Sequence, residues 1–342
     1  MDARRPDDDI IQELLLLATT DTTDPPEWAL DLELRKLEGT IIHTDGDLAR
    51  FVGICREARE RSNDPHVRGL FLLGVLNGTR RMEPTPVDEV SAIVRQANEE
   101  FGALPPGKRT ARLFNFLDFQ LSIHLAKVGD YALARETHEK TAAREDRIGN
   151  HAGTAISRFM AKREAVNEAL VAGTVDPNLL AELVLAGRSL AILIPEDSPE
   201  FVRWVHFNGP VHRLVAHFLA GDVSSSTNHG DGEHLCELFK LDFAFVKQNE
   251  GIYFLALAIQ AYGRGDYSCS YALARATLMT ANTPAEYYVV TYILLAELAL
   301  ERDDEETAKA ELTTALAISQ PGGHQARAVA ARILASFETS PT

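Results

Sequence analysis

The sequence has few cysteines and no long apolar run. Cys55, Cys236 and Cys269 are far apart and form no Cys-x-x-Cys pair, so neither a disulfide framework nor a thiolate zinc site is expected. The apolar stretch near the N-terminus, Leu14 to Leu17, follows an acidic run and is too short for a signal peptide or a membrane span. We therefore expect a cytoplasmic protein without a membrane partner.

Positive charge is scarce as well. The 342 residues include 34 lysines and arginines against 50 aspartates and glutamates, which gives a formal net charge of −16. A protein that binds nucleic acid through its phosphates needs clustered basic residues, and this chain has only short pairs such as Arg80-Arg81. We expect no nucleic-acid partner, because a basic or apolar partner suits the net charge better.

Common catalytic motifs are missing. No Gly-x-x-x-x-Gly-Lys-Ser/Thr, Gly-x-Ser-x-Gly or Gly-x-Gly-x-x-Gly sequence occurs. A phosphate-binding loop, a serine hydrolase and a dinucleotide-binding fold therefore have no support. We predict that the chain is not an enzyme and that it uses no cofactor and no metal.

One group of histidines keeps a catalytic alternative open. His206, His212, His217, His229 and His234 lie in one predicted hairpin, and a metal site needs several such side chains that converge. His212 and His217 are five residues apart, which is a poor interval for one face of a helix. A metal-dependent enzyme that uses the His206–His234 cluster is the third hypothesis, and a polar surface with a solvated loop is the simpler interpretation.

Strand patterns are absent from the sequence, whereas helix starts are plain. No stretch alternates β-branched or aromatic residues with polar ones, so no sheet is predicted. Capping residues precede a proline at Asp24-Pro25, Asp64-Pro65, Asp176-Pro177 and Thr283-Pro284. Proline is favoured at the first helical position because its missing N–H would have no partner there. The sequence therefore predicts an all-α protein.

The turns between the predicted helices are alike. Gly129-Asp130-Tyr131, Gly221-Asp222 and Gly265-Asp266-Tyr267 each lie between paired helices, and Asp303-Asp304 holds the same place in the last pair. Glycine accepts the left-handed backbone that ends a helix, and aspartate caps the helix that follows. Gly129 and Gly265 are 136 residues apart, which is four steps of 34.

This pattern resembles the tetratricopeptide repeat family, whose unit is a helix–turn–helix of 34 residues. The matching residues are Leu121, Leu125 and Ala134 around Gly129, Leu257, Ala258 and Ala261 around Gly265, and Tyr292, Leu295, Ala296, Ala308, Leu312 and Ala315 around Asp303. The resemblance implies a right-handed α-solenoid of about seven hairpins with terminal capping helices. We expect divergent hairpins in residues 1–107 and the repeat array in residues 108–342.

The resemblance also implies a groove, because the first helix of each hairpin lines the concave face in arrays of this family. The residues predicted to belong to this groove are Phe116, Phe119, Ile123, Leu255, Ile259, Tyr262, Arg264 and Glu297. The alternative is that the apolar members are core residues. We expect a non-catalytic adaptor or regulatory module that holds a protein or peptide segment in the groove. A regulator that senses a ligand or signal peptide is the second hypothesis.

Overall fold

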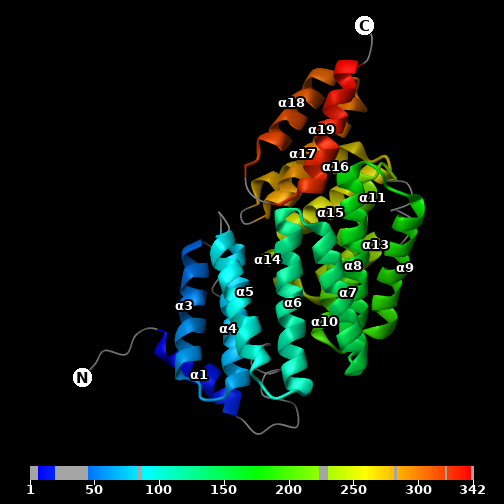
Figure 1. Ribbon diagram of the computed structural model, residues 1–342. Coiled ribbons are helices and arrows are strands. Elements are labelled where there is room, and N and C mark those ends of the chain that lie inside the picture. Colours follow the sequence, from blue (N-terminus) through cyan, green and yellow to red (C-terminus); the bar gives the residue numbers. More distant parts are fainter. Residues whose placement is uncertain are drawn as a thin grey trace. The chain divides into compact units, whose positions relative to one another are not determined.

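The computed structural model describes residues 7–19, 45–82, 86–222, 230–280, 283–319 and 322–339. Every regular element in these ranges is a helix, which confirms the all-α prediction (Figure 1). The chain divides into two compact units, Met1–His124 and Leu125–Thr342. The division falls inside helix α6 (Lys108–Val128), whereas the predicted boundary lies between residues 107 and 108. The predicted helix start at Asp24-Pro25 lies outside the described residues.

The first unit is organised around α4. Its helices are α1 (Asp8–Thr19), α3 (Asp45–Arg61), α4 (Pro65–Arg81), α5 (Val87–Gly102) and the first part of α6. Helix α4 packs against both α3 and α5 and is buried along most of its length. A Cβ on Gly78 would lie only 2.5 Å from Val52 Cγ2, and one on Gly69 would lie 2.8 Å from Phe101 Cε1. These two glycines therefore let the neighbouring side chains approach the α4 backbone.

The second unit consists mainly of consecutive helices that pack side by side. Its elements are α7 (Tyr131–Arg147), α8 (His151–Ala172), α9 (Pro177–Leu193), α10 (Pro199–Phe201), the π-helix η1 (Val202–Asn208), α11 (Gly209–Leu219), α13 (Asp231–Leu241), α14 (Phe243–Gln248), α15 (Glu250–Gly263), α16 (Tyr267–Met279), α17 (Ala285–Leu300), α18 (Glu305–Ala317) and α19 (His324–Thr339). The most extensive contacts join α7 with α8, α15 with α16, and α17 with α18. Helical hairpins are thus the local building blocks.

The same turn joins consecutive helices at four places, three with an aspartate as the second residue and one, Gly149-Asn150, with an asparagine. In the three turns with aspartate the first residue has a positive φ, which is 90°, 75° and 56° at Gly129, Gly265 and Asp303. The N–H of the aspartate that follows donates to the carbonyl five residues earlier, at 2.9, 2.9 and 3.0 Å. The carboxylate of that aspartate then accepts from the N–H three residues later, at 3.2, 3.1 and 3.1 Å. The predicted combination of a left-handed residue and an aspartate cap is confirmed at these turns.

Two other predicted signals behave differently. Gly221 also has a positive φ and lies just after α11, but the carboxylate of Asp222 lies 3.2 Å from His217 Nδ1, and the residues that follow Asp222 lie outside the described ranges. Helix α17 begins at Ala285 without a side-chain cap, because the hydroxyl of Thr283 donates to the carbonyl of Thr280 at 3.4 Å. At both places the sequence predicts the end or the start of a helix correctly. The described hydrogen-bond partners of the Asp222 carboxylate and of the Thr283 hydroxyl are not the ones that the sequence predicts.

The C-terminal helix α19 connects parts of the second unit that are distant in sequence. It packs against α17, α18 and α8. Arg332 donates to the carbonyls of Leu170 at 2.6 Å and Val171 at 3.2 Å, which are among the last of α8, and Tyr131 is hydrogen-bonded to Gln325. In a simple open array each repeat contacts only its sequence neighbours. The contact of α19 with α8 is therefore an additional constraint on this unit.

The shared turn makes a prediction that separates backbone strain from packing. No atom lies within 4 Å of a Cβ built on Gly265, whose φ is 75°. Gly265→Ala should therefore destabilise the chain by about 1–2 kcal/mol through the left-handed backbone alone. Asp303→Gly removes the same strain and should stabilise by up to about 1 kcal/mol. Urea unfolding followed by circular dichroism measures both changes.

Gly102→Ala is the matched control, because Gly102 also has free space around its Cβ position but lacks a positive φ. This substitution should be neutral or stabilising. Equal effects of Gly265→Ala and Gly102→Ala would contradict the geometry assigned to the turn.

Candidate functional site

The structure places the predicted groove residues in both units. Phe116, Phe119 and Ile123 lie on the part of α6 that belongs to the first unit, and all three are partly buried. Phe116 packs against the core of that unit. The other five residues lie in the second unit. Each unit therefore carries a subset of the predicted groove residues.

Leu255 and Ile259 occupy the interior of the second unit. Both are completely buried on α15, which packs against α11, α13, α14, α16 and α17. They present no surface to a ligand, in agreement with the alternative interpretation that these positions are core. Tyr262, Arg264 and Glu297 keep accessible side chains, so these three remain candidates for a binding surface.

Tyr262 and Glu297 belong to an aromatic and acidic surface, which we call the Tyr–Glu patch and define as Tyr262, Tyr267, Tyr271, Glu297 and Glu301. The hydroxyl of Tyr262 donates to Glu301 Oε1 at 3.3 Å, and its ring centroid lies 5.6 Å from that of Tyr267. Tyr267 and Tyr271 are 41% and 42% exposed although they are large aromatic residues. The patch thus combines rings and carboxylates that are open to solvent.

The two carboxylates of the Tyr–Glu patch, Glu297 and Glu301, make this surface negative and affect the pKa values of its side chains. Burial, followed by repulsion from Glu301, raises the pKa of Glu297. The pKa of Tyr262 is also raised, first by burial and then by Glu297 and Glu301. Arg264 lies 3.5 Å from Glu233, and the Arg302 guanidinium lies 5.6 Å from the centre of the Tyr271 ring. Within the patch itself, an added positive charge would therefore be stabilised.

A second polar group is buried in the same unit, and we call it the Arg163 cluster: Arg163, Glu164, Asn167, His212 and Glu286. The Arg163 side chain bonds the completely buried carboxylate of Glu164, with 2.9 Å between Nε and Oε1. Asn167 Nδ2 donates to the other oxygen of Glu164 at 2.9 Å. Arg163 Nη1 lies 3.2 Å from His212 Nε2. The cluster connects α8 with α11 through one guanidinium.

The charges of the Arg163 cluster are balanced internally. Burial lowers the pKa of Arg163, but Glu164, together with Glu286 and Tyr287, raises it, and the net shift is upward, so the guanidinium stays charged. Burial and then Arg163 lower the pKa of His212 well below its usual value. His212 is therefore neutral and accepts the hydrogen bond from Arg163 through Nε2. Burial, followed by Arg163, likewise lowers the pKa of His138 to about 3.

Sequence reasoning missed the Arg163 cluster because its members are distant in the chain. Arg163 and His212 are 49 residues apart, and Glu286, whose pKa is raised first by burial and is also influenced by Arg163 and Glu164, lies on α17. No local motif connects such positions. Tyr267 and Glu301, by contrast, were within reach, because Tyr267 belongs to the Gly-Asp-Tyr turn and Glu301 follows Glu297 by one helical turn.

The histidines of the alternative metal-dependent hypothesis have separate partners. His212 contacts Arg163, and His217 Nδ1 lies 3.2 Å from Asp222 Oδ2. His206 and His234 meet each other, with 3.4 Å between their Nδ1 atoms. His229 lies outside the described residues. Within the described ranges, no three or more His, Cys, Asp or Glu side chains are grouped to hold a metal ion.

His206 lies in the π-helical turn η1, which the sequence analysis did not predict. The N–H of Gly209 donates to the carbonyl of Trp204, five residues earlier. Pro210 explains this turn, because proline has no N–H and its ring would meet the carbonyl four residues earlier in an α-helix. Gly209 is also required, since a Cβ there would lie 2.6 Å from the Trp204 carbonyl oxygen. Such π turns are frequent at functional sites.

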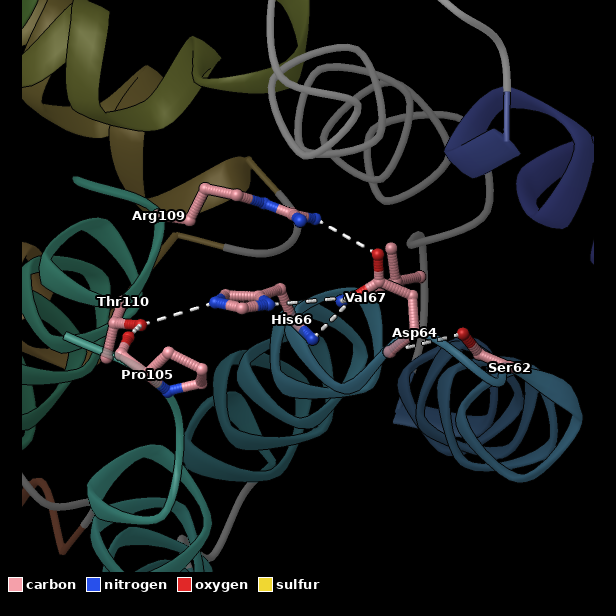
Figure 2. Close-up of polar contacts among 7 residues, drawn as sticks. All are labelled: Ser62, Asp64, His66, Val67, Pro105, Arg109 and Thr110. Carbon is pink, nitrogen blue, oxygen red and sulfur yellow. Dashed lines mark hydrogen bonds and ion pairs between the residues drawn. The ribbon is translucent and has the colours of Figure 1, made fainter. Parts of the chain in front are cut away.

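In the first unit, a polar network connects the starts of α4 and α6 (Figure 2). The carboxylate of Asp64 caps α4 by accepting from the N–H groups of His66 at 2.8 Å and Val67 at 3.4 Å. It also accepts from Arg109 Nη2 at 3.1 Å. Burial raises the pKa of Asp64, but the N–H groups of His66 and Val67 together with Arg109 lower it, and the net shift is downward. The predicted helix start at Asp64-Pro65 is thereby confirmed.

Figure 2 also shows an Asp–His–Thr sequence of contacts that resembles a catalytic arrangement only superficially. His66 Nε2 lies 3.2 Å from Thr110 Oγ1, and this hydroxyl donates to the carbonyl of Pro105 at 2.6 Å. Since its proton is used there, the hydroxyl accepts from His66 and is not activated by it. A nucleophile would need the opposite direction of the hydrogen bond. The network therefore anchors two helix starts.

A small hollow in the first unit carries positive charge that is already compensated. Its volume is about 200 Å³, and Arg56, Arg59 and Gln96 are among the residues that line it. Arg56 Nη2 lies 2.7 Å from Glu89 Oε1, and Arg59 forms an ion pair with Glu100. Because both arginines are already paired with glutamates, the hollow is a weak candidate for an anion-binding site.

The buried charge of the Arg163 cluster leads to a stability prediction. Glu164→Gln should destabilise the chain by about 3 kcal/mol or more, because it leaves Arg163 charged and without its buried counter-ion. The adjacent pair Lys162–Glu182 is the control, since its side chains are 44% and 50% exposed. Glu182→Gln should cost less than about 1 kcal/mol. Chemical unfolding measures both values, and similar losses would show that the Arg163 cluster is not a desolvated ion pair.

Comparison of the sequence with protein-family models and with curated proteins found no match. No helix in the described part of the chain is both long and apolar enough to cross a membrane. The function is therefore inferred from the geometry and electrostatics of the sites above.

Proposed function

We propose that the chain is a non-catalytic adaptor or regulatory module that binds a basic segment of a partner protein. In this proposal the helical hairpins form a right-handed solenoid of the tetratricopeptide type. The recurrence of one turn at Gly129, Gly265 and Asp303 supports it, as does the packing of α7 on α8, α15 on α16 and α17 on α18. Because fold alone does not determine function, the proposal rests on one surface.

The Tyr–Glu patch is the observation that carries the proposal. Glu297 and Glu301 repel each other strongly enough for this repulsion to contribute to the raised pKa of Glu297. A cation placed between them would lower that repulsion and form charge-assisted hydrogen bonds. The adjacent exposed ring of Tyr267 adds cation–π attraction of about 0.5–1 kcal/mol at such an accessible site, whereas the Tyr271 ring already faces the Arg302 guanidinium.

These features determine the chemistry of the partner. A lysine or arginine side chain satisfies both the carboxylates and the ring faces, and its apolar stem packs on the tyrosines. The net charge of −16 further favours association with basic segments over acidic ones. Tyr262 and Glu297 lie on α15 and α17, the first helices of consecutive hairpins, which the resemblance assigns to the concave face.

A library of labelled seven-residue peptides with a fixed central residue tests this proposal. Fluorescence polarisation should show that the wild-type chain prefers peptides centred on lysine or arginine over those centred on glutamate. The double variant Glu297→Gln/Glu301→Gln should lose at least about tenfold in affinity, because each lost charge-assisted contact contributes roughly 1.5–3 kcal/mol at most sites.

The control removes the same amount of charge at an unrelated place. Glu196→Gln/Asp197→Asn changes two exposed carboxylates in the segment between α9 and α10 and should leave the binding unchanged. If peptides centred on glutamate bind equally well, or if both double variants behave alike, the proposal is wrong.

The raised pKa of Glu297 also predicts how stability depends on pH. A carboxyl whose pKa is higher in the folded state favours folding when it is protonated, below its unfolded pKa of about 4.3. That contribution is lost as the pH rises through the folded pKa. Glu297→Gln should therefore raise the melting temperature at neutral pH, and the gain should shrink toward pH 4. Glu196→Gln should show neither effect, and a lower melting temperature of Glu297→Gln at neutral pH would contradict the assignment.

A sensor of a small ligand or signal peptide is the second candidate. It is favoured by the Arg163 cluster, because Arg163 keeps 15% of its side chain exposed although it is paired with a fully buried carboxylate. A ligand that binds only the folded chain raises its melting temperature, and the rise grows with the logarithm of the ligand concentration above the Kd. Such a shift with a small anion, and its absence in Arg163→Lys, would favour the sensor over the adaptor.

A further inference from the structure

Two imidazole rings meet where η1 passes the first turn of α13. The Nδ1 atoms of His206 and His234 are 3.4 Å apart, and the ring centroids are 5.1 Å apart with planes inclined by 67°. Both side chains are partly exposed. The pair is held by two elements in contact with each other, so its geometry is a property of the fold.

The separation of the two nitrogens is the one that a single tetrahedral metal ion imposes. Zinc binds histidine nitrogen at about 2.0–2.1 Å, so two such ligands at a tetrahedral angle lie about 3.4 Å apart. Because the rings are inclined and not stacked, both Nδ1 lone pairs can be directed at one point between them. A hydrogen bond between the same atoms needs a proton on only one of them.

The charge state of the pair also suits a cation. Burial, followed by the nearby His206 and Arg213, lowers the pKa of His234, so this ring is neutral at pH 7. Arg213 itself is neutralised by a buried ion pair with Asp231. A metal would displace the proton shared by the two Nδ1 atoms and leave each ring protonated at Nε2.

We propose that His206 and His234 form a binding site for one divalent transition-metal ion of the zinc or copper class, with the two Nδ1 atoms as its protein ligands. Imidazole is a ligand that these metals share. Since no third protein donor of the His, Cys, Asp or Glu type completes the group within the described residues, water occupies the remaining positions. The site is separate from the Tyr–Glu patch and does not depend on the proposed function.

Metal titration of the full chain, purified without a histidine tag and freed of metal by a chelator, tests this site. Calorimetry should show one equivalent of Zn²⁺ bound per chain, and Co²⁺ should give the visible absorption of a four-coordinate ion. His206→Gln and His234→Gln should each abolish this stoichiometric binding. His151→Gln, which changes an exposed histidine on α8, is the matched control and should bind as the wild type does.

Nitrogen-15 spectra of the wild-type histidine rings give a second readout that needs no folded variant. Zinc should shift the Nδ1 resonances of His206 and His234 more than those of the other histidines. The proposal is overturned if the wild-type chain binds no stoichiometric zinc, if both variants bind it equally well, or if zinc leaves the two Nδ1 resonances unchanged.

Discussion

A left-handed residue followed by an aspartate or asparagine is the constraint on which the best-packed hairpins of the second unit depend. The positive φ ends one helix, and the side-chain oxygen of the next residue satisfies a free N–H of the following helix. The helices that this turn joins pack against each other in the pairs α7–α8, α15–α16 and α17–α18. Asp303 keeps the turn at φ 56° without a glycine, which shows that the surrounding packing determines the conformation even where the residue does not favour it.

A feature could be predicted from the sequence when the residues that form it are close together in the chain. The turns and the proline-marked starts at Asp64 and Asp176 depend on residues within one helical turn, and their hydrogen bonds are as expected. The contact of Arg332 with α8 and the hydrogen bond from Arg163 to His212 connect residues 162 and 49 positions apart. No pattern in a single sequence contains that information.

The groove prediction depends on both local spacing and long-range packing, and only the local part could be derived from the sequence. Helical spacing correctly groups Leu255, Ile259 and Tyr262 on neighbouring turns of α15, but spacing cannot show which face a neighbour covers. Because α15 is enclosed by five other helices, only Tyr262 of these three residues reaches the surface. The π turn η1 escaped prediction for a related reason: Pro210 lies inside a helix, where it signals a distortion but not the register that results.

The second unit contains two different arrangements of charged side chains, the Arg163 cluster and the Tyr–Glu patch. The functional proposal is based on the difference between them. In the Arg163 cluster, Glu164 has its counter-ion and a further donor from Asn167, so its carboxylate is already satisfied within the fold. In the Tyr–Glu patch, two carboxylates raise each other's electrostatic energy beside exposed rings. Buried, satisfied charges hold helices together, whereas accessible and mutually repelling ones gain from a partner.

Photo-crosslinking from position 267 tests the central claim most directly. A photoreactive amino acid in place of the exposed Tyr267 would label whatever occupies the Tyr–Glu patch, and the same group at Ile192, which is 80% exposed on α9, reports non-specific contact. The account predicts that segments labelled from position 267, and not from 192, are rich in lysine and arginine and are displaced by a lysine- or arginine-centred peptide. Equal labelling from both positions, or labelled segments that are predominantly acidic, would contradict it.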